Sequence, residues 1–396
     1  MHIVHTFGHL VGGTLLIAGT SIGVGMLALP IATGQSGFFP SLFVYILCWL
    51  FMLLTGLLIL EACIWMPKNA NLITMTQRLL GSWGRRACWV LYLFLFSCLM
   101  IAHVASGGSI LAELTGLQLP YQLSMVIYVL LFSPVIYFGA LWVDRLNLLM
   151  MLGVGITYIL FVTTSIHYIT PSFVMRSDWS LLWKGLPVIF TAFGYQSLIP
   201  TLFNYMNRDV SKVRIALILG TTIPLVIYVL WQLIIVGIIP LEGSDGLMAA
   251  FNKGQNAVVP LSLYLHNTTV LNIGRGFAFF AVTTSYLGIS IAFLDFLADG
   301  FKLKKSRKGR LVACLLMFLI PLIICLIDPH LFLTALNWAG GIGVALLLGL
   351  IPILMVWAGR YYEGHSLMHQ QVKGGKITLG ILALFVILEI GVTLYG

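Results

Sequence analysis

The chain has 396 residues, of which 60% are hydrophobic and only 8% are charged, with a mean hydropathy of +1.03. Soluble domains carry about 25% charged residues, so this composition excludes a water-soluble fold and predicts a protein that resides in lipid. The formal net charge of +9 raises the question of a nucleic-acid partner, which the placement of the basic residues answers below.

The apolar runs predict spanning helices along the whole chain, since a helix that crosses a bilayer needs about 20 mostly apolar residues. We therefore predict one all-α integral membrane domain over residues 1–396 with about 11 transmembrane helices. Ten or twelve helices also fit, because little separates the ninth run from the tenth. The predicted spans are residues 7–33, 39–65, 86–114, 121–143, 147–169, 183–206, 213–240, 270–300, 310–327, 330–358 and 377–395.

The basic residues are distributed unequally between the two sides of these spans. If the N-terminus is cytoplasmic, all but four of the 21 Lys and Arg residues fall on the cytoplasmic side, where such residues are enriched. The four exceptions are Arg176, Lys184, Lys253 and Arg275. The positive charge is thus a topology signal, and we expect a lipid bilayer around the chain but no nucleic acid and no obligate protein partner.

Two of the spans contain residues that interrupt helices. The first carries Gly19, Gly23 and Gly25 ahead of Pro30, and the sixth carries Gly194 between Pro187 and Pro200. Unpaired backbone groups at membrane depth are tolerated only where they line a protein or water cavity. Glycines that merely permit close helix packing are the alternative explanation.

Because the interrupted spans lie five spans apart, they favour two inverted repeats of five helices, in which helices 1 and 6 are unwound at mid-membrane. The first repeat would cover residues 1–170 and the second residues 183–358, followed by an additional C-terminal helix at 377–395. Free N–H groups at such breaks suit a carboxylate and free carbonyls suit an ammonium, which together predict a site for a zwitterion.

Several ionisable residues lie inside spans, where they are costly and are functional candidates by default. Glu61 could be a structural ion-pair partner, a gate residue or a protonation site. His103 could be a buried core histidine, a proton relay or a contact to a substrate hydroxyl. Asp295 and Asp299 share a helix face beside the basic segment 302–310, so we expect an ion pair that closes a gate or anchors that loop.

Five segments resemble the hydroxy/aromatic amino acid permeases of the amino acid–polyamine–organocation superfamily, and among them most closely the tyrosine-specific permeases. The segments are residues 19–30, 55–67, 106–109, 190–196 and 293–299. The resemblance implies an eleven-helix secondary active transporter in a bacterial inner membrane, with a cytoplasmic N-terminus, that imports an aromatic amino acid, tyrosine first, by alternating access and cation symport, with H⁺ as the cation. His103 departs from the family pattern, so the resemblance assigns it no role.

The resemblance also suggests where substrate and ions would bind. Ala281, Thr284 and Ser285 resemble positions at which sodium-coupled members of the superfamily bind Na⁺ against the first helix, here at Gly19 and Ile22, although Thr and Ser often bond only their own backbone. Expected substrate-binding residues are Gly19, Thr20, Ser21, Ile22, Gly23, Gly25, His103, Ser106, Gly107, Phe190, Ala192, Phe193, Gly194, Tyr195, Gln196 and Tyr286. Expected coupling or gate residues are Glu61, His103, Asp295 and Asp299.

Two alternatives to a proton-coupled tyrosine importer remain open. One is a Na⁺-coupled symporter of tryptophan or another neutral amino acid. The other is an intramembrane enzyme, suggested by His103 near Ser106 and Ser109 but disfavoured because the chain contains no HExxH motif and no clustered metal-ligand spacing. We expect no enzyme activity and no cofactor apart from the co-transported ion.

Overall fold

The structure is a computed structural model that describes residues 2–115, 120–303, 307–365 and 370–395. In these ranges the chain is predominantly helical, and its β-type pairing is limited to one isolated antiparallel bridge between Gly37 and Ser177. Ten described helices are long and apolar enough to cross a membrane, and a bent helix pair at the N-terminus makes eleven. The predicted all-α membrane fold with about 11 spans is therefore confirmed.

The spans follow one another with short helices between them. The spanning elements are α1 (His2–Ser21) with α2 (Val24–Thr33), α3 (Phe38–Ile64), α4 (Leu72–Thr115), α5 (Tyr121–Phe138), α6 (Ala140–Ser165), α8 (Leu186–Ala192) with η3 (Gln196–Leu198) and α9 (Ile199–Tyr205), α10 (Val210–Ile238), α13 (Thr268–Gly300), α14 (Arg307–Ile327), α15 (Phe332–Trp338) with η4 (Ala339–Leu350) and α16 (Ile351–Tyr361), and α17 (Gly375–Tyr395). The connecting elements are η1 (Ile166–Tyr168), α7 (Pro171–Met175), η2 (Trp179–Leu181), α11 (Leu247–Asn252) and α12 (Val258–Tyr264).

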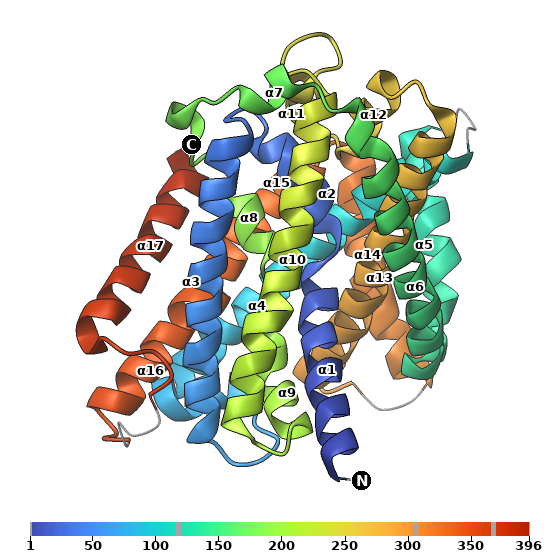
Figure 1. Cartoon of the computed structure of the whole chain (residues 1–396). Helices are drawn as coiled ribbons and strands as arrows, with labels where there is room; N and C mark the ends of the chain where they lie inside the picture. Colours follow the sequence, from blue (N-terminus) through green and yellow to red (C-terminus); the bar gives the residue numbers. More distant parts are fainter. Residues whose placement is uncertain (1, 116–119, 304–306, 366–369, 396) are drawn as a thin grey trace.

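The helix bundle has two distinct ends. Figure 1 shows the N-terminus of α1 at one end, and the short helices α7, α11 and α12 together with the C-terminus at the other. Inside the bundle, α1 packs against α10, α2 packs against α8, and α13 packs against both α4 and α6. Large apolar side chains on the outside of α6, such as Leu141, Leu149 and Ile159, are mostly exposed, which suits contact with lipid.

The boundary between the fourth and fifth spans differs from the prediction. We expected a polar break between residues 143 and 147, but Asp144 and Arg145 lie within α6. The break is instead at Gly139, whose φ of +117° is a conformation that side-chain-bearing residues rarely adopt. Arg145 lies 5.7 Å from the centre of the Trp142 ring, as expected near a membrane interface.

The third span is also longer than predicted. The helix α4 begins at Leu72, and Gly81, with φ +75° and ψ −164°, separates a short first segment from the span itself. Asn71 and Thr74 cap the start reciprocally, each backbone N–H donating to the other side chain at 2.9 Å. Residues 72–80 include Gln77 and Arg78, so their hydrophobicity alone did not predict a helix there.

The tenth span contains a π-helix, η4, that the sequence did not predict. Its two adjacent glycines face two different helices. A Cβ on Gly340 would lie 1.7 Å from the Pro187 carbonyl oxygen at the start of α8, and one on Gly341 would lie 1.8 Å from the Thr393 hydroxyl of α17. Only glycine fits at these two positions, because real Cβ atoms do not approach other atoms so closely.

Candidate functional site

The first span is interrupted at residues 22–23. The helix α1 ends at Ser21, α2 begins at Val24, and the two axes differ by 52°. A Cβ on Gly23 would lie only 2.5 Å from the Ser285 hydroxyl oxygen of α13, so a glycine is needed for this approach. Pro30, which helped to predict the break, lies inside α2. The break leaves carbonyl groups at the end of α1 and N–H groups at the start of α2 outside the regular helix pattern.

The sixth span is interrupted where the sequence predicted. The helix α8 ends at Ala192, and a 3₁₀ turn begins at Gln196. The Gln196 side chain accepts a hydrogen bond from the Tyr195 backbone N–H at 2.9 Å. The two interrupted spans touch, because a Cβ on Gly25 would lie 2.9 Å from the Cα atom of Ala192.

One side chain joins both breaks. The Tyr228 hydroxyl of α10 lies 2.5 Å from the Ser21 carbonyl oxygen and 2.8 Å from the Ala192 carbonyl oxygen. These carbonyls belong to the last residues of α1 and α8, and the Tyr228 side chain is fully buried. The sequence did not single out Tyr228, whose only signal was a polar group within an apolar span.

His103 is connected to the first break through Ser285. Its Nδ1 lies 2.6 Å from the Leu99 carbonyl oxygen, which can only accept, so Nδ1 carries the proton. The Nε2 atom then accepts a hydrogen bond at 2.9 Å from the Ser285 hydroxyl, the group that also lies against Gly23. His103 is fully buried. The structure thus brings together His103, Ser285 and Gly23 from three different spans.

The remaining candidate ion ligands have local partners. The Thr284 hydroxyl donates to the Ala281 carbonyl at 3.0 Å within α13. Gly19 faces α6, where a Cβ would lie 3.0 Å from the Met151 methyl carbon. The Ile22 N–H donates to the Ala18 carbonyl, which continues the helix pattern of α1.

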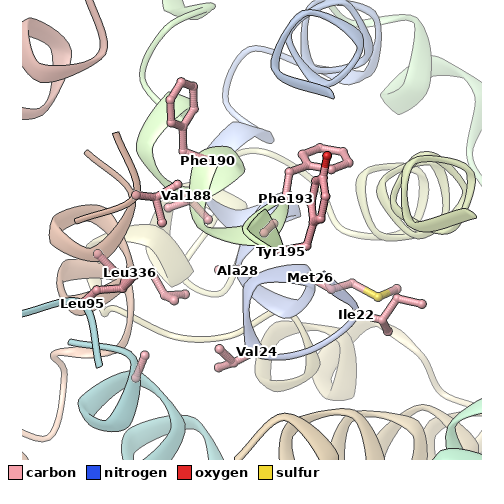
Figure 2. Packing of buried hydrophobic residues seen from close by; sticks show 14 of the residues in the cluster. Ile22, Val24, Met26, Ala28, Leu95, Val188, Phe190, Phe193, Tyr195 and Leu336 are labelled. Atoms are coloured by element: carbon pink, nitrogen blue, oxygen red, sulfur yellow. The ribbon is translucent and has the colours of Figure 1, made fainter. Parts of the chain in front are cut away.

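Several predicted substrate-binding side chains point elsewhere in this conformation. Figure 2 shows Phe190 directed away from Phe193 and Tyr195. The Phe190 ring stacks on that of Phe51, with the ring centres 5.2 Å apart. The Tyr195 hydroxyl reaches α3 and donates to the Met52 carbonyl at 3.2 Å.

Other candidates also face away from the breaks. The Gln196 side-chain amide donates to the Met52 carbonyl and to the Thr55 hydroxyl, both at 3.2 Å. The Tyr286 ring packs on the Tyr128 ring at 5.1 Å, and a Cβ on Gly107 would collide with that same ring. Sequence reasoning located the helices correctly but could not give the direction of each side chain.

Two further candidates lie in the first and third spans. The Thr20 side chain is exposed and donates to the Leu16 carbonyl at 2.7 Å. The Ser106 hydroxyl is buried and has no hydrogen-bond partner within the described residues. It lines a small cavity of about 40 Å³ together with Ser109 and Asn256, whose side chains share a 2.8 Å hydrogen bond. Ser106 therefore borders a small cavity that other polar side chains also line.

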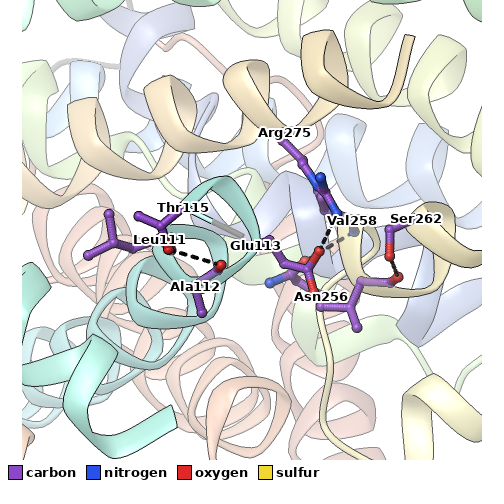
Figure 3. A network of polar contacts seen from close by, with 9 residues as sticks. Leu111, Ala112, Glu113, Thr115, Asn256, Val258, Ser262 and Arg275 are labelled. Carbon is purple, nitrogen blue, oxygen red and sulfur yellow. Dashed lines mark hydrogen bonds and ion pairs between the residues drawn. The ribbon is translucent and has the colours of Figure 1, made fainter. Parts of the chain in front are cut away.

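An ion pair lies close to this small cavity. Figure 3 shows Arg275 of α13 directed at Glu113 of α4, and their charged groups are 2.7 Å apart. Because both side chains are partly exposed, the pair contributes about 1 kcal/mol or less to stability. The pair joins α4 to α13 at the end of the bundle where the chain carries α11 and α12.

Glu61 forms a buried ion pair with Arg360. Two guanidinium nitrogens donate to its carboxylate oxygens at 2.6 and 2.7 Å, and each side chain is only 1% exposed. The Gln371 N–H donates to the same carboxylate at 2.7 Å, and Arg360 also donates to the Val372 carbonyl. Of the three interpretations of Glu61, this geometry fits the structural ion-pair partner.

Asp295 and Asp299 line a cleft of about 920 Å³ with Arg307 and Arg310. Arg310 also donates to the Ile136 carbonyl at 3.1 Å, which ties α14 to α5. The expected ion pair that closes a gate or anchors the loop stays a prediction, for which Arg307 and Arg310 are the basic residues in the same cleft. Residues 304–306 of the basic segment lie outside the described residues.

These features together define a class of protein. A bundle of membrane-spanning helices, in which two interrupted spans meet and free backbone groups converge between them, is the architecture of secondary transporters. The chain belongs to the tryptophan/tyrosine permease family, whose pattern matches residues 7–393.

Comparison with individual proteins agrees with this assignment. The tryptophan-specific transport protein of Pseudomonas aeruginosa is 34% identical, over 95% of this chain and 92% of that relative. The tyrosine-specific transport system 1 of Haemophilus influenzae is 30% identical, over 94% of this chain and 93% of that relative. A solved manganese transporter of Eremococcus coleocola shares the fold, with a TM-score of 0.63 at 16% identity over 97% of this chain and 85% of that structure.

The chain is thus a multi-pass membrane protein of a bacterial permease family for aromatic amino acids. The resemblance found in the sequence is confirmed. The alternative of an intramembrane enzyme is rejected, since the relatives are named as transport proteins.

Proposed function

We propose that the chain imports an aromatic amino acid, tyrosine first, across the bacterial inner membrane by proton symport, with its N-terminus in the cytoplasm. The observation that carries this proposal is the meeting of the ends of α1 and α8 at Tyr228, together with the start of α2 directly after Gly23. Alternating access would come from two inverted repeats, residues 1–170 and 183–358, with the helix at 377–395 outside the repeats.

The backbone at the breaks suits the polar end of an amino acid. The carbonyls of Ser21 and Ala192 can accept hydrogen bonds from an ammonium group, which is favoured at the C-terminal ends of two helices. The N–H groups after Gly23, at the start of α2, suit a carboxylate for the opposite reason. Both charges of a zwitterion would therefore find complementary groups within one break region.

His103 is the proposed proton carrier. Its Nε2 is the only ring nitrogen available for a second proton, because Nδ1 already carries one. A proton on Nε2 would force the Ser285 hydroxyl to stop donating to that atom. Since Ser285 lies against Gly23, reorientation of the Ser285 hydroxyl would change the contacts at the break where the substrate binds. Protonation and substrate binding would thus act on the same contact.

An alternative substrate and an alternative coupling ion each have specific support. Tryptophan is supported as the substrate because the relative from Pseudomonas aeruginosa is named tryptophan-specific. Na⁺ coupling is supported by the Ser285 hydroxyl beside the first break and by the Thr284 hydroxyl and Ala281 carbonyl that precede it in α13, because oxygen is the ligand type that hard cations prefer. No cofactor beyond the co-transported ion, and no protein partner, is part of the proposal.

Uptake into proteoliposomes tests these proposals together. Labelled tyrosine, tryptophan and phenylalanine are offered separately, with a proton gradient or a sodium gradient imposed one at a time. We expect tyrosine to accumulate against its concentration gradient when protons flow inward. Accumulation driven only by a sodium gradient would show that Na⁺, not H⁺, is the coupling ion. Faster uptake of tryptophan at low concentration would show that tryptophan, not tyrosine, is the preferred substrate. No accumulation under either gradient would reject symport.

A further inference from the structure

The Tyr228 hydroxyl occupies the point at which the two interrupted spans come together. It lies within hydrogen-bonding distance of the last carbonyl of α1 and the last carbonyl of α8, at 2.5 and 2.8 Å. Its ring packs edge-on against Phe193, the residue that follows α8, with the ring centres 5.1 Å apart. The side chain is fully buried, so water does not compete for these contacts.

This arrangement leaves one acceptor without a complete partner. A phenol hydroxyl has a single proton, so it can donate fully to only one of the two carbonyls at a time. Both carbonyls end helices and therefore lack the usual partner within the helix. Buried acceptors without a donor are unfavourable, so a group with more than one donor would bind here better than Tyr228 does.

An ammonium group has more hydrogen-bond donors than a phenol. It presents three N–H donors and a positive charge, so it can bond both carbonyls at once with charge-assisted hydrogen bonds. We propose that the Tyr228 hydroxyl is an internal substitute for the ammonium group of the amino acid, which holds the carbonyls of Ser21 and Ala192 in the empty carrier and is displaced when substrate binds. This inference rests on the proposed function, since it assumes that the substrate carries an ammonium group.

Displacement has a mechanical consequence. The Tyr228 ring must move when its hydroxyl leaves the two carbonyls, and the Phe193 ring packed against it must adjust. Phe193 lies in the interruption between α8 and η3, so substrate entry at the first break would be transmitted directly to the second. Tyr228 is thus a positioning residue that the substrate must outcompete.

The test compares two ligands in two variants by calorimetry in detergent. One ligand is the amino acid that the wild-type protein binds best, and the other is its deaminated analogue, which keeps the ring and the carboxylate but lacks the ammonium. In Tyr228→Phe the competitor is gone, so we expect the amino acid to bind about tenfold more tightly, while the affinity for the analogue stays unchanged. Tyr158→Phe is the matched control, because the Tyr158 hydroxyl also donates to a backbone carbonyl of α10, at Ile227.

The other outcomes overturn the inference in distinguishable ways. Weaker binding of the amino acid to Tyr228→Phe would make Tyr228 a direct substrate contact, and unchanged binding would make it a structural residue only. An equal gain for both ligands would show that the ammonium is not what Tyr228 replaces. If the wild-type protein binds no aromatic amino acid, the proposed function fails and this inference fails with it. Tyr228→Met, which also lacks a donor, replaces Tyr228→Phe if that variant does not fold.

Discussion

Glu61 and Arg360 are separated by almost 300 residues in the chain, yet they form a two-point ion pair at 2.6 and 2.7 Å with both side chains 1% exposed. The pair joins α3 to α16, and its bonds to Gln371 and Val372 also hold the segment that leads into α17. Breaking such a pair leaves a buried charge without a partner.

Glu61→Gln is therefore expected to destabilise the folded protein by about 3–5 kcal/mol, which lowers the apparent melting temperature in detergent. The double variant Glu61→Met with Arg360→Met is the control, because it removes both charges and should recover most of the loss. An unchanged melting temperature in Glu61→Gln, together with loss of proton-driven uptake, would instead assign Glu61 to coupling.

Glu389 is a second buried glutamate, and its surroundings differ from those of Glu61. Both carboxylate oxygens are buried, and neither has a hydrogen-bond partner within the described part of the chain. Replacing an unpaired buried polar group by an apolar one of similar length removes an unfavourable contact. We expect Glu389→Met to raise the stability by about 1–3 kcal/mol, as measured by thermal unfolding of the purified protein. A lower melting temperature would mean that Glu389 has a partner in the folded protein after all.

The substitution His103→Ala is expected to abolish proton coupling without abolishing substrate binding. In His103→Ala the hydrogen bond to Ser285 is lost, together with the imidazole that would carry the proton. We expect exchange of labelled for unlabelled substrate to continue, while proton-driven accumulation is abolished. His330→Ala is the control, since His330 is an exposed histidine bonded to the Lys253 carbonyl. Accumulation at the wild-type level in His103→Ala would remove His103 from the coupling mechanism.

Asp209 makes a contribution to stability that depends on pH. The Lys212 ammonium lies 3.0 Å from its carboxylate, and the Lys212 backbone N–H donates to it at 3.1 Å where it caps the start of α10. These two contacts hold the pKa of Asp209 below its usual value. A lowered pKa stabilises the folded protein above the unfolded pKa of about 3.9, and the contribution is lost as the pH falls through the lower folded value.

The matched pair Asp209→Asn and Asp209→Ala measures this effect. The asparagine keeps the cap without the charge, so it should differ little from wild type in stability and should lack the acid-dependent loss. The alanine should cost about 1 kcal/mol at neutral pH. Melting temperatures between pH 3 and 7 give both results, and an identical pH profile for wild type and Asp209→Asn would contradict the assignment.

The sequence predicted those parts of the fold that depend on local chemistry. Glycine and proline spacing located both breaks, and hydrophobic length located the spans, because each is a property of a short segment. The start of α6 was misplaced because one glycine, Gly139, determined it while the polar residues Asp144 and Arg145 did not.

The site was only partly predictable, because it depends on contacts between distant segments. His103 was identified as a candidate, but its bond to Ser285 spans 182 residues, and no local pattern encodes such a pairing. Phe190 was expected at the site for its position beside the break, yet its ring packs on Phe51. Tyr228 was missed because its role arises from two carbonyl groups on other helices.

The adjacent glycines of η4 have a consequence for how the carrier can move. Gly340 is pressed against α8 and Gly341 against α17, at separations that leave no room for a methyl group. A segment packed this closely on two sides cannot shift toward either neighbour, so we expect η4, α8 and α17 to move together as one unit. Spin labels that report distances should then find the separations of η4 from α8 and from α17 unchanged throughout a transport cycle.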